Sequence, residues 1–91
     1  MAVYVDDARI EWRGRRWSHL QADSADELHA FAARLGLPRR AFQSKPHKPE
    51  HDHYDVPDEL RARAIRLGAV AETWREGARR RRPGRPALSD R

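Results

Sequence analysis

Two segments of the chain carry almost the same amphipathic pattern, and this repeat limits the folds open to 91 residues. Residues 26–36 and 58–68 are identical at eight of eleven positions, and both run from Asp-Glu-Leu to Arg-Leu-Gly. Acidic residues at the start and glycine at the end are typical of α-helices. Each predicted helix has one apolar stripe that must be buried against another layer, so the repeat predicts two helices packed on a common partner.

The first repeat has the strongest helix signals in the chain. Ser24 and Glu27 have the spacing of a capping box, in which each side chain bonds the backbone amide of the other. The second predicted helix begins at Pro57, a residue favoured in the first turn. The two stripes consist of Leu28, Phe31, Ala32 and Leu35, and of Leu60, Ala64 and Leu67. Two explanations fit the repeat: a duplicated helix–strand unit around a pseudo-twofold axis, or similar capping and solubility requirements.

The segments between these helices predict short strands. Residues 2–5 alternate small with β-branched or aromatic residues, and residues 17–22 alternate loosely, with Trp17, His19 and Gln21 on one side. Gly14 marks a hairpin tip before the second of these segments. Residues 69–73 predict a further short strand, whereas residues 44–53 contain two prolines and predict an exposed loop. We therefore expect a small single α/β domain with three to four short strands and two helices packed on the sheet. It would cover residues 1–76 and be followed by a basic, disordered tail at 77–91.

The net charge of +5 is concentrated in the tail. Residues 77–91 contain six arginines and one acid, whereas residues 1–76 contain thirteen basic and thirteen acidic residues. A cluster of arginines in a short tail favours salt-sensitive contact with nucleic acid. Within it, Gly84-Arg85-Pro86 matches the centre of an AT-hook, a motif that binds the minor groove. Pro83 displaces the first arginine of that motif, and a solubilising terminus is the alternative. The candidate nucleic-acid contacts are Arg79, Arg80, Arg81, Arg82 and Arg85.

The composition excludes several classes of protein. The chain has no cysteine, which excludes disulfides, thiolate zinc sites and cysteine nucleophiles. It shows no signal peptide and no apolar run near the ~20 residues that span a bilayer. We expect a cytoplasmic protein without membrane contact, and the sequence leaves its oligomeric state open.

Polar residues at the predicted ends of strands and helices are candidates for catalysis. Asp6 and Asp7 end the first strand, where two carboxylates suit a divalent metal, although a turn-initiating Asp is the alternative. His19, Asp23 and His29 lie near the second strand and the first helix. They could move protons, or they could be a helix cap and hydrogen-bonded core histidines. Arg40 and Arg61 could hold phosphate oxygens, or be solvated surface.

The densest cluster of metal-binding residue types is at residues 47–55. His53 and Asp55 directly precede the second helix, and imidazole with carboxylate suits zinc, manganese or iron. His47 and His51 lie in the proline-rich loop, which offers less rigid support for a ligand. Thus His53 and Asp55 are the candidate metal ligands, with a divalent metal as the candidate cofactor.

Several of these blocks, in order, resemble one family. Val3-Tyr4-Val5-Asp6-Asp7, Trp17-Ser18-His19-Leu20, Ala22-Asp23, Glu27–Ala32, Arg40–Gln43, His53-Tyr54-Asp55 and Gly68-Ala69-Val70 are similar to the domain of unknown function 4031 family (DUF4031) of small bacterial and phage proteins. The resemblance covers about residues 2–76 and implies no established activity. Ala41 stands where the family usually has Trp, and the loop with His47 and His51 lies outside the shared pattern.

Three functions fit these observations. The first is metal-assisted chemistry on a phosphate ester, which includes nucleic acid, carried out by the histidines and aspartates. The second is a non-catalytic nucleic-acid-associated module that uses the arginine-rich tail. The third is an adaptor that presents a polar cleft to a protein. Convergence of Asp6, His19, His29, His53 and Asp55 in one pocket would favour the first.

Overall fold

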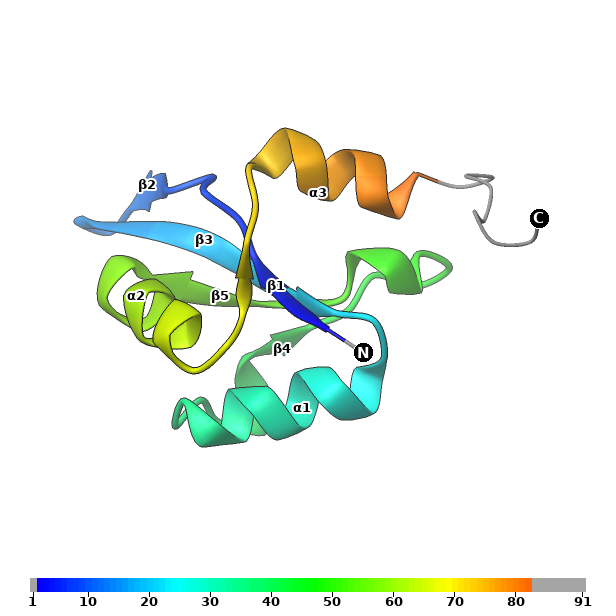
Figure 1. Cartoon of the computed structure of the whole chain (residues 1–91), viewed down its shortest axis with the longest axis horizontal. Helices are drawn as coiled ribbons and strands as arrows, with labels where there is room; N and C mark the ends of the chain where they lie inside the picture. Colours follow the sequence, from blue (N-terminus) through cyan, green and yellow to red (C-terminus); the bar gives the residue numbers. More distant parts are fainter. Residues whose placement is uncertain (1, 83–91) are drawn as a thin grey trace.

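The computed structural model describes residues 2–82 and confirms the predicted α/β class. The described residues form six short strands and three α-helices, whereas the sequence predicted three to four strands and two helices. Figure 1 shows their arrangement. The elements are β1 (Val3–Val5), β2 (Ile10–Trp12), β3 (Arg15–Ala22), α1 (Ala25–Arg34), β4 (Phe42–Gln43), β5 (His53–Pro57), α2 (Asp58–Arg66), β6 (Val70–Ala71) and α3 (Trp74–Arg81). Short 3-10 turns at Arg39–Ala41 and Pro49–His51 complete the described part of the chain.

The strands form one mixed sheet with the order β4-β5-β3-β1-β6, and β2 pairs separately with β3. All pairs are antiparallel except β1 with β6. The β2–β3 hairpin turns through Arg13 and Gly14, which both have positive φ (53° and 77°), as a tight hairpin of this twist requires. The predicted hairpin tip is therefore confirmed. Pairing of β3 with β5 places His19 opposite Asp55, a contact that fixes the geometry of the candidate site.

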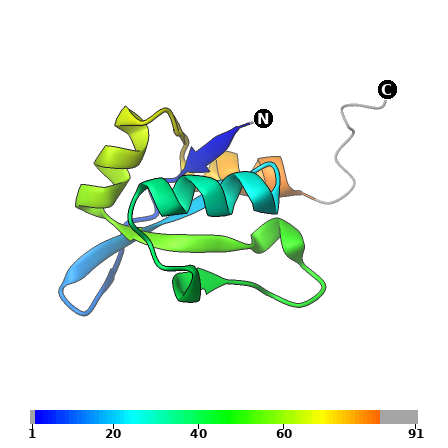
Figure 2. The ribbon, with the colours of Figure 1, turned by 90° about the horizontal axis from the view of Figure 1, so that it is seen from below.

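The apolar core lies between the sheet and helices α1 and α2. Figures 1 and 2 show α1 running across one side of the sheet, with α2 on the same side. Ser24 caps α1 as predicted, because its hydroxyl accepts a hydrogen bond from the Glu27 amide at 3.2 Å. The core consists of Val5, Leu20, Leu28, Phe31, Ala32, Leu35, Tyr54, Val56, Ala64 and Ala69. Both predicted helical stripes contribute to it, so the repeat gives two helices on one face.

The repeated helices end alike, but the strands that follow them do not occupy equivalent places. Gly36 and Gly68 have φ of 83° and 111°, and in each case the following amide bonds a carbonyl of the last helical turns. After α1 the chain enters β4, beside β5 at one edge; after α2 it enters β6, beyond β3 and β1 at the other edge. The equivalence therefore extends over the helices and their C-terminal ends but not their N-caps, which are Ser24 with a side-chain bond and Pro57 without one. Duplication of a whole helix–strand unit stays a hypothesis.

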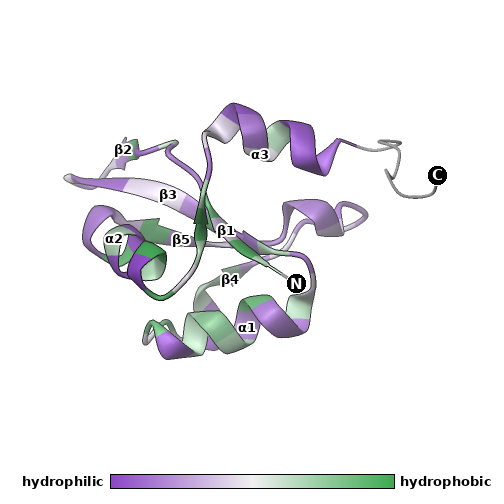
Figure 3. Ribbon diagram, in the orientation of Figure 1, coloured by the Kyte–Doolittle hydropathy of each residue, from purple (hydrophilic) through white to green (hydrophobic). Residues whose placement is uncertain are grey.

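Helix α3 lies on the opposite side of the sheet from α1 and is more hydrophilic along its length (Figures 1 and 3). Thr73 and Glu76 form a capping box that begins it. This corrects the expectation of a disordered tail from residue 77, because residues 77–81 continue the helix and Arg80 and Arg81 bond the sheet. Residues 83–91, with Arg85, lie outside the described part. Within that part, no helix has the length and apolar character needed to cross a membrane.

Candidate functional site

The face of the sheet opposite the core carries a cluster of polar side chains. Alternation along β3 buries Leu20 against the helices and directs His19 to the other face, as the sequence predicted. The same alternation on β5 buries Tyr54 and Val56 and leaves His53 and Asp55 on the polar face. The ligand-type atoms of His19, His53 and Asp55 lie within 4.8 Å of one another. Two strands that are far apart in sequence thus supply one compact His/Asp cluster.

Asp6 fixes the orientation of His19. Its carboxylate accepts hydrogen bonds from the His19 ring Nδ1 (2.8 Å), the His19 amide (2.9 Å) and the Ala8 amide (3.1 Å). Burial alone would raise the pKa of Asp6, which is 3 % exposed, but these hydrogen bonds outweigh burial and leave the pKa lowered. An ionised Asp6 requires a proton on Nδ1 of His19, so the lone pair of neutral His19 lies on Nε2.

His53 is oriented in the same way by a backbone group. Its Nδ1 donates to the carbonyl oxygen of His51 at 2.8 Å, and its Nε2 lies 3.3 Å from an oxygen of Asp55. Burial would lower the pKa of His53, but the bonds to Asp55 and to the His51 carbonyl raise it above its ordinary value. The protonated form of His53 is therefore stabilised by an ion pair from its Nε2 to the Asp55 carboxylate.

Asp55 is held from a third strand. Its second oxygen accepts a hydrogen bond from the Gln43 amide on β4 at 2.6 Å. The bond from His53 is the main cause that lowers the pKa of Asp55, and Gln43 contributes in the same direction. The carboxylate is thus ionised at neutral pH and has both oxygens fixed. Gln43 was part of the family resemblance, but a neutral amide gave no signal of a chemical role in the sequence.

A pocket of about 210 Å³ adjoins this cluster. Its walls come from β3, from the segment between β4 and β5, and from the end of α3. Burial lowers the pKa of His51 here, and the nearby charge of Arg81 lowers it further. Burial, followed by the neighbouring Arg80, likewise lowers the pKa of Arg81. The lining residues are His19, Gln21, Gln43, Ser44, Lys45, His51, His53 and Arg81.

Three of the predicted catalytic residues lie elsewhere. Asp7 is exposed and accepts a hydrogen bond from the Trp74 amide at the start of α3. Asp23 accepts bonds from the Ala2 amide and the Tyr4 hydroxyl, so it ties β1 to the end of β3. His29 bonds the Tyr54 hydroxyl at 2.8 Å on the core face. These positions match the alternative of structural hydrogen bonding.

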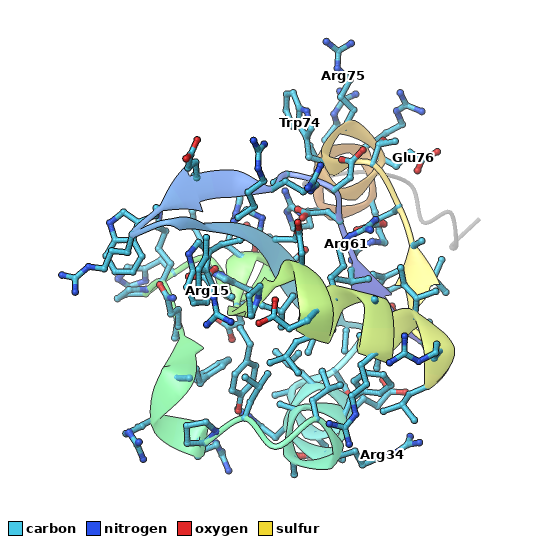
Figure 4. The ribbon with its side chains drawn as sticks, turned by 90° about the vertical axis from the view of Figure 1, so that its left-hand side faces the viewer. Arg15, Arg34, Arg61, Trp74, Arg75 and Glu76 are labelled. Carbon is cyan, nitrogen blue, oxygen red and sulfur yellow. The ribbon has the colours of Figure 1, made fainter. Side chains whose placement is uncertain are left out.

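The predicted phosphate-binding arginines are also separate from the pocket. Arg61 donates from Nε to the backbone carbonyl of Asp6 at 2.7 Å, and thereby joins α2 to the end of β1 (Figure 4). Arg40 is exposed in the turn before β4. Arg80 bonds both oxygens of Glu72, and Arg81 bonds Gln21, so two arginines assigned to a nucleic-acid tail are used within the fold.

The fold and this cluster define a small α/β protein with a His/Asp site on the open face of its sheet. Residues 3–83 match the family described as "Protein of unknown function (DUF4031)", so the chain belongs to that family and the resemblance seen in the sequence is confirmed. The match extends through α3, which includes the Arg81 wall of the pocket. No curated protein and no solved structure matches the chain significantly.

Proposed function

We propose that this protein is a metal-dependent enzyme that acts on a phosphate ester. The ligands would be His19 Nε2, His53 Nε2 and the carboxylate of Asp55. One observation carries the proposal: Nδ1 of each ring is already bonded to a fixed acceptor, which leaves Nε2 of both histidines available in a cluster whose ligand-type atoms lie within 4.8 Å of one another. Carboxylate and carbonyl partners of this kind are what orient histidines toward metals in proteins.

The donor set fits a divalent transition metal. An ion with bonds of about 2.1 Å holds its ligand atoms roughly 3–4 Å apart, so atoms within 4.8 Å need only a small contraction. Two imidazoles and one carboxylate suit zinc, manganese or iron(II), and they leave positions free for water and substrate. A bound ion would replace the proton that lies on His53 Nε2 and faces Asp55.

Each residue of the cluster would have a defined part in such a reaction. A bound divalent ion would supply a water of lowered pKa and positive charge for an anionic transition state. Asp6 would hold His19 in the required tautomer, and Gln43 would keep the Asp55 carboxylate from rotating. The pocket would admit the ester from the side of the β4–β5 segment.

Thermal unfolding with MnCl₂ or ZnCl₂ tests the metal centre. At a metal concentration of 100 times Kd the stabilisation is about 2.7 kcal/mol, which raises Tm by roughly 10 °C or more for a domain of this size. His53→Gln should abolish the increase. The matched control is His47→Gln, an exposed histidine outside the cluster, which should retain it. An equal increase in both variants would show non-specific binding and contradict the proposal.

Hydrolysis of 4-nitrophenyl phosphate and of bis(4-nitrophenyl) phosphate tests the enzymatic part. Turnover should require the metal that stabilises the protein, and Asp55→Asn should lose it while the circular-dichroism spectrum stays unchanged. A protein that binds metal specifically but hydrolyses neither ester would have a metal site without this activity.

A second candidate, a nucleic-acid-associated module, rests on the outer face of α3. Trp74 is 54 % exposed, and Arg75 lies with its guanidinium 5.5 Å from the ring centroid. Figure 4 shows both side chains pointing away from the sheet. Together with Arg79 and Arg82 they line a shallow hollow, and exposed aromatics with arginines suit single-stranded nucleic acid. Trp74→Ala should weaken binding of a labelled oligonucleotide without changing its salt dependence, because it removes a stacking surface. Arg82→Gln should weaken binding and reduce the salt dependence; unchanged binding in both variants would exclude this surface.

A further inference from the structure

The pocket beside the His/Asp cluster has a cationic wall that the proposed metal centre does not use. Lys45, in the β4–β5 segment, and Arg81, in the last turn of α3, both line it. Neither residue was a candidate for the chemistry of this cluster from the sequence. The two come from different elements that line a cavity of about 210 Å³, which is the space of about seven water molecules at ~30 Å³ each.

Arg81 has hydrogen-bonding capacity that the fold leaves unused. Its Nη1 donates to the neutral amide oxygen of Gln21 at 2.6 Å. Its Nε is buried and has no hydrogen-bond partner in the part of the chain that the structure describes. Nε belongs to the edge of the guanidinium that binds phosphate oxygens in a bidentate manner. Nε has almost no accessible surface, so a bound oxyanion would reach it only after a shift of the Arg81 side chain, and the charge of Arg81 at the pocket wall is what would attract the anion.

The charges around the pocket also favour an anion. Glu72, an acid close to Arg81, has both oxygens bonded to Arg80. A divalent ion at the proposed centre would be neutralised by Asp6 and Asp55. Glu50 and Lys48, whose charges also act on the pocket residue His51, offset each other. The charges of Lys45 and Arg81 would then be left for the ligand, and two positive charges match the dianionic phosphate of a monoester better than the single charge of a diester.

We infer that this pocket is the binding site for the terminal phosphate of a phosphomonoester, held by Arg81 and Lys45 beside the His19, His53 and Asp55 cluster. The inference rests on the proposed function for the reacting end of the ligand, and it names the substrate class of that site. The dimensions of the pocket enclose a phosphate group and a few further atoms. The remainder of the ligand would lie outside, toward solvent.

Isothermal titration of the full chain with phenyl phosphate, in the presence and absence of Mn²⁺, tests the inference. Arg81→Gln and Lys45→Gln should each weaken binding about 10- to 100-fold, as expected for loss of a charge-assisted hydrogen bond. The controls are Arg66→Gln, an exposed arginine in the last turn of α2, and Lys48→Gln in the same segment as Lys45. Both should bind as the parent does. Diphenyl phosphate should bind at least tenfold more weakly than phenyl phosphate.

The outcomes separate this inference from the proposed function. Specific Mn²⁺ binding without phenyl phosphate binding would overturn the phosphate site and leave the metal centre in place. Equal losses in Arg81→Gln and Arg66→Gln would also overturn it, because the effect would then be general charge. Absence of Mn²⁺ binding would contradict the proposed metal centre. The titration with phenyl phosphate in the absence of metal would then show whether Arg81 and Lys45 bind the phosphate on their own.

Discussion

The two faces of β3 and β5 consist of alternate residues of the same strands, yet one face is held by apolar packing and the other by hydrogen bonds. On one face Leu20, Tyr54 and Val56 are at most 1 % exposed and pack under α1 and α2. On the other, His19, His53 and Asp55 are partly exposed and held by hydrogen bonds. The first face stabilises the fold by burying apolar surface. On the second face, hydrogen bonds fix the positions of the two imidazole rings and the carboxylate. A side chain's face, more than its strand, therefore decides its role.

The largest predicted effect separates these two roles at adjacent positions. Leu20→Ala removes a fully buried side chain and should lower the free energy of unfolding by about 3 kcal/mol. His19→Gln, one residue away, should lower it by about 1 kcal/mol while abolishing metal binding. Urea denaturation of both variants measures the difference. Equal destabilisation by the two substitutions would mean that His19 is mainly structural. It would contradict the different roles assigned to the two faces.

Asp6→Asn should show an acid-dependent loss of stability. Hydrogen bonds to an ionised buried carboxylate contribute about 2 kcal/mol at pH 7. The pKa of Asp6 is lowered in the folded state, so this stabilisation is complete above the unfolded pKa of ~3.9 and is lost as pH falls through the lower folded value. The difference between parent and variant should therefore shrink toward pH 2. A difference that stays constant with pH would contradict this origin.

Metal binding should strengthen with pH around neutrality. The pKa of His53 is raised, so in the metal-free protein its protonated form stabilises the fold below the unfolded pKa of ~6.5, and that contribution is lost as pH rises through the folded value. The same proton competes with the metal, so affinity should rise up to tenfold per pH unit, about 1.4 kcal/mol, until His53 is neutral. Thermal shifts with MnCl₂ at pH 6 and pH 8 measure this. A larger shift at pH 6 would exclude His53 as a ligand.

The smallest predicted effect concerns a hydroxyl on the core face. Tyr54→Phe removes the partner of His29 and should lower the free energy of unfolding by about 1 kcal/mol. Metal affinity should stay unchanged, because Tyr54 lies on the opposite face of β5 from Asp55. Calorimetry of metal binding to the folded variant gives the comparison. A loss of affinity would show that the two faces are coupled through β5.

The local parts of the fold could be predicted because their signals are local. The Ser24 cap, the glycine in the hairpin and the alternation that separates His19 from Leu20 each depend on a few neighbouring residues. For α3, residues 74–78 predict a helical turn and the four arginines that follow predict disorder, but the helix continues through Arg81. The error shows that a charge run can end a helix whose side chains bond the sheet.

The arrangement of the candidate site depends on contacts that the sequence pattern does not contain. His19 meets Asp55 because β3 pairs with β5 in one register, and a shift of one residue would exchange the faces of the strand. His29 lies on the core face because α1 packs there. Arg61 bonds the backbone carbonyl of Asp6, just after β1, and the two residues come together only in the folded chain. Such long-range pairings assign each polar residue its partner. Composition identifies only the residue types.

Gly77 in the middle of α3 has a consequence for how the pocket is assembled. A methyl group in its place would lie 2.7 Å from Glu72 Oε2 and 3.0 Å from Arg81 Nη1. The chain therefore carries, inside this helix, a residue that weakens isolated helices by about 1 kcal/mol relative to Ala. An eight-residue helix of this composition is marginal in water by itself, so its order depends on the contacts of Arg80 and Arg81 with the sheet. Ordering of this helix should therefore accompany the placement of Arg81 at the wall of the pocket.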